Sequence, residues 1–339
     1  MTPRLPSPEG AATYHAGCRA VRRATPILAT VLVLIGATPA PSAAARQAVP
    51  RDDGAAASAA AEAGLLLRQL GSTRRVLLIA AHPDDEDTAL LAELDRSRGV
   101  RTAYLSLTRG EGGQNVIGPE LGAGLGLIRT GELLAARRLD GAEQYFTRAY
   151  DFGYSKTAEE TFRHWPRDEL LRDVVWRIRR FRPQVVVSIF SGTPADGHGH
   201  HQVAGMLARR AFEAAADSTR FPDQLERGVG PWEASKLYRR AWRDPDRATL
   251  RVPTGEYDPL LGRSPFQLAM EGRSQHRSQG FGTVQPPGPR FTRLVLVENR
   301  TQAAPDAPLF AGVDTTLAGT AAGLGGRARR VLEKKASSL

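Results

Sequence analysis

The sequence predicts an α/β protein built on a Rossmann-like, doubly wound and mostly parallel sheet. Two observations carry this prediction. Apolar runs of strand length alternate with amphipathic stretches of helical length, which is typical of βαβ units. The first of these runs, Val76–Ala81, is also uninterrupted, as expected for a strand that is buried on both faces of a parallel sheet. With 339 residues, of which 41% are hydrophobic and 24% charged, the chain is long enough to bury such a core.

The predicted elements follow one another in a regular order. Residues 46–72 are alanine-rich and predict a linker with a short helix at Ala59–Leu70. The first strand is the apolar run Val76–Ala81, and residues 301–339 predict a low-complexity tail or linker. Each helix is expected to end near a glycine or proline where the sequence supplies one. The other elements are helix Thr88–Arg98, strand Thr102–Leu107, the Gly-rich loop Thr108–Gly126, helices Ile128–Leu139 and Glu169–Phe181, strand Gln184–Phe190 and helix His201–Ala216.

The first 45 residues have the order of a secretory signal peptide. A basic region with Arg22 and Arg23 precedes the apolar run Ile27–Ala37, and a small-x-small cleavage motif ends at Ala45. The apolar run is shorter than the ~20 residues of a membrane-spanning helix, so no stable membrane span is expected; an uncleaved amphipathic anchor is the alternative. Cleavage would remove Cys18, the single cysteine, which suits a periplasmic or extracellular location. Arg22 and Arg23 also allow a twin-arginine signal, although the residues around them match it only loosely, so both the Sec and the Tat route stay open.

The basic charge of the chain does not indicate a nucleic-acid partner. The formal net charge is +10, and lysine occupies only positions 156, 236, 334 and 335, so the basic residues are almost all arginine. These arginines are scattered among acidic residues, without a basic run interleaved with aromatic side chains. We therefore expect no nucleic-acid binding.

A cluster of polar residues follows the first predicted strand. The segment His82-Pro83-Asp84-Asp85-Glu86 brings one imidazole and three carboxylates to the carboxyl end of a buried strand, where ligands bind in sheets of this class. Burying this much charge is costly unless it is compensated, and a divalent metal is a common compensation. An acidic helix N-terminus is the alternative, which accounts for Asp85 and Glu86 but leaves His82 unexplained.

A second cluster follows the strand Gln184–Phe190. It contains His198, His200 and His201, and neutral imidazole is the commonest zinc ligand in a site that has no cysteine. One His and one Asp from the first cluster with one His from the second would leave a fourth metal position open, as in catalytic zinc sites. A surface histidine cluster without a fixed role is the alternative.

These segments resemble one known family. Over roughly residues 73–300 the chain is similar to the PIG-L/LmbE-like zinc-dependent N-acetylglucosaminyl deacetylases, which implies a single catalytic domain there. The most specific motif is Ala81–Glu86, and each of the others comes at the expected place in the order of elements. The other motifs are Thr108–Asn115, Ile128–Glu132 and His198-x-x-His201.

The resemblance implies a role for each matching residue. His82, Asp85 and His201 would hold Zn²⁺, with Fe²⁺ as the alternative in the cell, and Asp84 would be the general base toward the metal-bound water. His198 would stabilise the oxyanion or protonate the leaving amine. The polar segment around His276 resembles one in long, exported relatives and would close the pocket. The substrate-binding residues expected in this way are Arg129, Arg109, Asn115 and His276.

The chain departs from the family pattern at two positions. Many relatives have Asp where this chain has His200, and an aromatic residue where it has Asp196. These differences affect the substrate pocket and the surroundings of His201. They also leave open whether His200 replaces His201 as a metal ligand.

The function expected from these features is that of an exported, metal-dependent hydrolase. It would remove the N-acetyl group from an N-acetylglucosamine-type sugar or glycoconjugate. One alternative is a zinc amidohydrolase for a different N-acyl amine. Another is a non-catalytic carbohydrate-binding protein, which would need neither Asp84 nor His198 beside a complete ligand set. The sequence indicates neither the acceptor that carries the sugar nor the oligomeric state.

Overall fold

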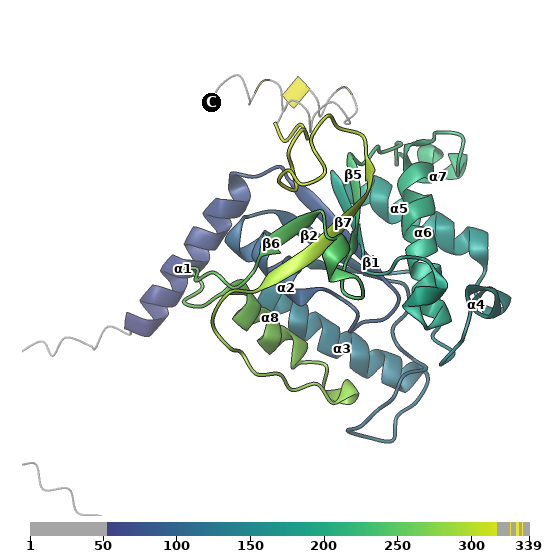
Figure 1. The fold of residues 1–339 in the computed structure, drawn as a ribbon, viewed down its shortest axis with the longest axis horizontal. Helices are drawn as coiled ribbons and strands as arrows, with labels where there is room; N and C mark the ends of the chain where they lie inside the picture. Colours follow the sequence, from purple (N-terminus) through teal and green to yellow (C-terminus); the bar gives the residue numbers. More distant parts are fainter. Residues whose placement is uncertain (1–52, 317–325, 327–329, 332–333, 335–339) are drawn as a thin grey trace, which may run out of the picture. The chain divides into compact units, whose positions relative to one another are not determined.

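The fold is taken from a computed structural model that describes residues 53–316, together with 326, 330, 331 and 334 (Figure 1). The expected signal peptide, residues 1–45, lies outside the described residues. Within the described part of the chain, no helix combines the length and the apolar character that crossing a bilayer requires.

One seven-stranded sheet organises the described residues. Its strand order is β3-β2-β1-β4-β5-β7-β6. The first five strands in chain order are mutually parallel, whereas β7 runs antiparallel to both β5 and β6. This confirms the predicted α/β class and the mostly parallel sheet. The strands are β1 Arg75–Ala80, β2 Arg101–Ser106, β3 Glu143–Phe146, β4 Val185–Ser188, β5 Lys236–Arg240, β6 Leu250–Pro253 and β7 Phe291–Asn299.

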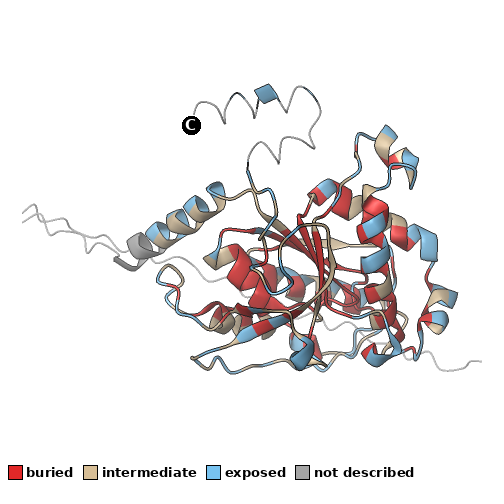
Figure 2. Ribbon diagram, turned by 45° about the horizontal axis from the view of Figure 1, so that its top comes forward, coloured by how far each residue is buried: buried red, intermediate tan, exposed pale blue. Residues whose placement is uncertain are grey.

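Helices cover the sheet on both sides (Figure 1). Helices α5 and α6 pack against each other and contact β1, while α2 and α3 pack with α8 in a separate group. Apolar side chains from both groups form one core with those of β1 and β4, so these strands are enclosed on both faces. Figure 2 shows the central strands of the sheet coloured as buried. The helices are α1 Asp53–Leu70, α2 Thr88–Ala92, α3 Ala123–Asp140, α4 Ala158–His164, α5 Arg167–Phe181, α6 Gly199–Ala216, α7 Pro222–Glu226 and α8 Pro265–Arg273.

The direction of chain crossing changes between β1 and β4. From β1 the chain moves outward to β2 and β3, and then returns to place β4 on the other side of β1. The register of Ile79 with Ser188 ends both strands at the same edge of the sheet. In doubly wound sheets the ligand binds at such a switch point, outside the carboxyl ends of the strands. The loops that follow β1 and β4 are the two that carry the predicted metal ligands.

Several predicted boundaries differ from the structure. Helix α1 begins at Asp53 and α3 at Ala123, inside the stretch expected to be a Gly-rich loop; Leu125 is fully buried and anchors the first turn of α3. The expected helix Thr88–Arg98 is an α-helix only as far as Ala92. It continues as a π-helical turn over Glu93–Ser97. After β7 the chain returns to the core, where Leu309 is buried.

Candidate metal centre and active site

Two loops at the sheet edge bring the predicted metal ligands together. His82 and Asp85 follow β1 directly, and His201 lies in the first turn of α6, after β4. The hydroxyl of buried Tyr104 donates a hydrogen bond to the carbonyl oxygen of His82, and the backbone N–H of His82 donates to Asp85 Oδ2 at 2.7 Å. These bonds fix the loop after β1 in a tight turn that directs both side chains toward α6.

Ligand atoms of these three residues lie 3.1–3.5 Å from one another, and both carboxylate oxygens of Asp85 take part. Asp85 Oδ2 lies 3.1 Å from His82 Nδ1, His201 Nε2 lies 3.2 Å from His82 Nδ1, and His201 Nε2 lies 3.5 Å from Asp85 Oδ1. Ligand atoms bonded to one tetrahedral zinc ion at 2.0–2.1 Å are separated by about 3.4 Å, so the set fits such an ion. The mixture of two imidazoles and one carboxylate also suits a borderline cation.

The electrostatics of the three residues also favour a cation. Burial alone would raise the pKa of Asp85, but His201 and His82 outweigh it and hold that pKa well below its usual range. Burial likewise opposes protonation of His82, yet Asp85 raises the pKa of the imidazole above its ordinary value. The Asp85 carboxylate is therefore ionised, and a divalent ion between it and the two imidazoles would stabilise this negative charge.

Asp84 lines the same cleft but is bonded to an arginine instead of the two histidines. Its carboxylate oxygen Oδ1 accepts a hydrogen bond from Nη2 of Arg129, and Nη1 of the same guanidinium donates to the carbonyl of Gly110 at 3.1 Å. Arg129 is buried, and its Nε has no partner among the described residues. Arg129 therefore holds the Asp84 carboxylate in the cleft, separate from the ligand atoms of His82, Asp85 and His201.

His198 occupies the N-cap position of α6. Its Nδ1 accepts a hydrogen bond from the backbone N–H of His200 at 3.2 Å, and Ser155 Oγ lies 3.4 Å from the same nitrogen. Burial, with His82 and His201 adding to it, lowers the pKa of His198 to about 4. The ring is thus neutral at pH 7, and because Nδ1 accepts, its hydrogen is on Nε2, available for donation.

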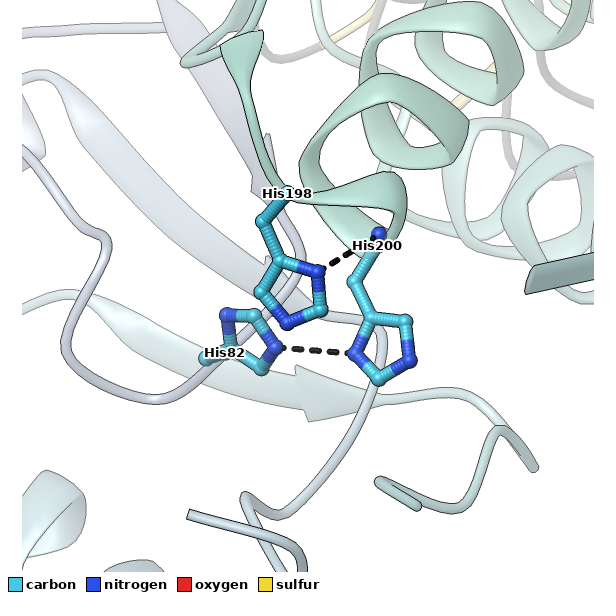
Figure 3. Close-up of side chains that lie close together, drawn as sticks. All are labelled: His82, His198 and His200. Atoms are coloured by element: carbon cyan, nitrogen blue, oxygen red, sulfur yellow. Dashed lines mark hydrogen bonds between the residues drawn. The ribbon is translucent and has the colours of Figure 1, made fainter. Parts of the chain in front are cut away.

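His200 lies behind the cluster and is fully buried. Its Nδ1 is 3.1 Å from His82 Nε2, the nitrogen of His82 that points away from Asp85 (Figure 3). His82, His198 and His200 thus form a second group of nitrogens close enough to hold a metal. The structure therefore keeps both ligand sets geometrically possible, with His82 common to the two.

The surrounding cleft has a volume of about 340 Å³. Besides the predicted residues, it is lined by Asp151, Gly153, Tyr154 and Gln279. Gln279 belongs to the polar segment around His276 that was expected to close the pocket, and it is the residue of that segment that reaches the cleft. Asp151 follows β3, a strand that was not predicted; had it been, the rule that ligands lie beyond strand ends would have indicated Asp151. We find no comparable sequence signal for Gly153 or Tyr154. The cleft residues are His82, Asp84, Asp85, Gly112, Gly113, Arg129, Asp151, Gly153, Tyr154, His198, His201 and Gln279.

Three residues expected to bind substrate do not line this cleft. Arg109 donates to Thr130 Oγ1 and stacks over Phe146, with its guanidinium carbon 4.0 Å from the ring centre. The Asn115 side chain donates to the carbonyl of Glu120. His276 is fully buried, with Nε2 at 2.8 Å from Glu86 Oε1. Of the four expected substrate-binding residues, the structure brings only Arg129 to the cleft.

Comparisons with known proteins agree with this arrangement. Residues 77–212 match the model of the family described as PIG-L, GlcNAc-PI de-N-acetylase. The chain is 34% identical to a 1D-myo-inositol 2-acetamido-2-deoxy-alpha-D-glucopyranoside deacetylase of Geodermatophilus obscurus, covering 57% of this chain and 69% of the relative. It is 37% identical to the protein of the same name from Rhodococcus opacus, covering 65% of this chain and 86% of the relative.

Among solved structures, the N,N'-diacetylchitobiose deacetylase from Pyrococcus horikoshii in complex with its inhibitor MPG superimposes with a TM-score of 0.49. It is 20% identical, over 69% of this chain and 81% of that chain.

The sequence relatives establish the family, because two of them are more than 30% identical to this chain over more than two thirds of their own length. This chain belongs to the PIG-L family of deacetylases.

Proposed function

We propose that the protein is a metal-dependent hydrolase that removes the acetyl group from the 2-amino position of an N-acetylglucosamine-type sugar or glycoconjugate. The observation that carries the proposal is the close approach of the ligand atoms of His82, Asp85 and His201, in a cleft that is also lined by Asp84 and His198. The relatives that match most of their length carry the name of a deacetylase of an acetamido sugar, which supports the same substrate class.

The donor set fits a divalent ion held by His82, Asp85 and His201. Such an ion polarises the acyl oxygen and lowers the pKa of water, which is what amide hydrolysis at neutral pH requires. Zinc fits this set, and Fe²⁺ is the alternative in the cell. Metal analysis of protein purified without added metal would show about one bound equivalent. Full activity of metal-free protein would refute this part of the proposal.

Asp84 and His198 take different parts in the reaction. Asp84, held by Arg129, accepts a proton from the attacking water as the new C–O bond forms. The N–H at Nε2 of the neutral His198 donates a hydrogen bond to the acyl oxygen as negative charge develops there, and the ring keeps its proton. Asp84 passes the proton it has accepted to the amine nitrogen as the C–N bond breaks, so acetate and the free amine leave and Asp84 is again a carboxylate.

A substrate panel tests this function directly. Zinc-loaded protein would be incubated with N-acetylglucosamine glycosides, including the inositol glycoside, and with unrelated N-acyl amines, and acetate release would be measured. Turnover of the sugars above all others supports the proposal. Turnover of only the unrelated amides would indicate a different amidohydrolase, and binding of the sugars without turnover would indicate a carbohydrate-binding protein. The matched control is the Asp84→Asn protein, which should release acetate about 10²–10⁴-fold more slowly.

We also propose that the enzyme acts outside the cytoplasm, because the first 45 residues have the order of basic, apolar and small-residue regions found in signal peptides. N-terminal sequencing of protein from the producing cell tests this. A mature chain that begins near Arg46 in the periplasmic or extracellular fraction is expected. An uncleaved Met1 start in the cytoplasmic fraction would refute it.

A further inference from the structure

His82, one of the three proposed metal ligands (the metal set, with Asp85 and His201), is also hydrogen-bonded to His200. His82 directs Nδ1 at Asp85 and His201, so with a cation on Nδ1 the hydrogen of the neutral ring is on Nε2. That nitrogen lies 3.1 Å from His200 Nδ1 (Figure 3). We propose that His200 is a positioning residue: a neutral imidazole that accepts the Nε2 hydrogen of His82 and thereby fixes the tautomer and orientation of a metal-binding ring. The inference rests on the proposed metal site.

Aromatic side chains enclose the ring of His200. The ring stacks on Trp165, with centroids 4.3 Å apart, and Phe152 meets it edge-on at 4.6 Å. An imidazole that accepts through Nδ1 carries its own hydrogen on Nε2, and Nε2 of His200 is buried with no partner among the described residues. The aromatic contacts therefore hold the ring in the orientation that the bond to His82 requires.

A carboxylate is close but does not take this role. Metal-binding histidines commonly donate their second N–H to a carboxylate or a carbonyl. Asp151 Oδ2 is 3.8 Å from His82 Nε2, beyond hydrogen-bond distance, and Asp151 Oδ1 accepts from the N–H of Gly153 at 2.9 Å. His200 is therefore the hydrogen-bonded partner of His82, and the ring is oriented by a neutral base rather than by an anion.

Residue 200 also acts through its backbone. The backbone N–H of His200 donates to Nδ1 of His198. The side-chain bond orients His82, whereas the backbone bond determines which nitrogen of His198 carries hydrogen. Substitution of the side chain should thus disturb the metal set and leave the tautomer of His198 unchanged.

The variants His200→Asn and His200→Leu separate the acceptor from the bulk of the ring. Oδ1 of Asn can occupy the position of His Nδ1, because both are bonded to Cγ, whereas Leu has nearly the same shape as Asn and offers no acceptor. Both variants lose the stack on Trp165 to the same extent. Urea unfolding of the metal-free proteins would verify that both are folded and equally destabilised.

The primary measurement is the zinc dissociation constant, obtained by competition with a chromophoric chelator. We expect His200→Leu to weaken zinc binding by about 10–100-fold, the usual range for losing such a partner, and His200→Asn to stay within about fivefold of wild type. The visible spectrum of the cobalt-loaded proteins should follow the same order, changed in His200→Leu and nearly native in His200→Asn.

Three outcomes would overturn the inference. Equal losses of affinity in the two variants would mean that acceptance of the hydrogen is irrelevant, and unchanged affinity in both would mean that the bond has no role. Loss of a whole metal equivalent in both variants would make His200 itself a ligand, as in the His82–His198–His200 set. These readouts do not depend on turnover. Absence of acetate release with the expected order of affinities would refute the proposed function alone.

Discussion

Asp95 offers a test of the fold that is independent of the catalytic site. It lies in the π-helical turn after α2 and is 2% exposed. Its Oδ1 accepts from Nε2 of Gln69 at 2.9 Å, and its Oδ2 accepts from Oγ1 of Thr102 at 3.0 Å. Burial outweighs these hydrogen bonds and raises the pKa of Asp95 to about 6. Thr102 is near the amino end of β2, the opposite edge of the sheet from the metal set.

The pKa difference determines both the sign and the size of the effect. The folded-state pKa of Asp95 lies above the unfolded value of 3.8, so its contribution to stability is complete below pH 3.8 and is lost as the pH rises to about 6. A difference of about two pH units corresponds to about 3 kcal/mol in the free energy of unfolding. At neutral pH the buried carboxylate is therefore a cost to the folded state.

The substitution Asp95→Asn should remove this cost. Asn keeps an oxygen for Thr102, and its amide nitrogen can donate to Gln69 once the Gln69 amide turns over. We expect the variant to be more stable than wild type by about 1–3 kcal/mol at pH 8, with the difference shrinking toward pH 4.5. Urea unfolding of both metal-free proteins between pH 4.5 and 8 measures it, and acetate release should be unchanged.

Two results would refute this reasoning. A stability difference that does not vary with pH would show that Asp95 titrates alike in the folded and unfolded chains. A variant less stable than wild type at pH 8 would show that the carboxylate's hydrogen bonds outweigh its desolvation. Comparison of the two proteins at each pH cancels the titration of every other group.

Three further predictions concern the site. Asp84→Asn should retain its metal and lose turnover by about 10²–10⁴-fold, whereas Asp85→Ala should bind metal more weakly and regain part of its activity with excess zinc. Metal analysis and acetate release, measured on both variants, separate the two roles. The reverse pattern would make Asp84 the ligand and Asp85 the base. His198→Ala should keep its metal and lose turnover, and a variant that loses the metal would make His198 a ligand. His276→Leu should lower the free energy of unfolding by about 3–5 kcal/mol, because it leaves the buried carboxylate of Glu86 without its imidazole, and an unchanged urea midpoint would contradict this.

The central strands could be predicted because their burial follows from the apolar composition of a few consecutive residues. The runs that form β1 and β4 are almost wholly apolar, β2 is largely so, and all three lie inside the sheet. The short edge strand β3, Glu143–Phe146, is only half-buried and gives no such signal. Strand β5 contains Lys236 and two arginines, and the side chain of Lys236 is buried beside the carbonyl of Leu309. Only the packed chain shows that this lysine belongs to a strand.

The site could be predicted in part for a related reason. His82, Asp85 and His201 follow strands that the sequence reveals, so their meeting at one edge follows from topology. Asp151 was missed because it follows β3. His276 was expected at the substrate because it lies in a polar segment, but its partner Glu86 is far away in sequence, and no local pattern indicates that the two pack together in the interior.

Asp84 and Asp85 show how far adjacent residues can differ in chemistry. The turn after β1 directs Asp85 toward two imidazoles and Asp84 toward a guanidinium. Arg129 is nearly enclosed and donates to both Asp84 and the carbonyl of Gly110, so its position is set by the protein before any substrate arrives. If its main task is to hold the base, Arg129→Met should lower kcat more than it raises KM, with the metal retained. If it binds the sugar, KM should rise and kcat should be nearly preserved. Steady-state kinetics on the best substrate of the panel distinguish the two, and the buried hydrogen bonds of Arg129 favour the first.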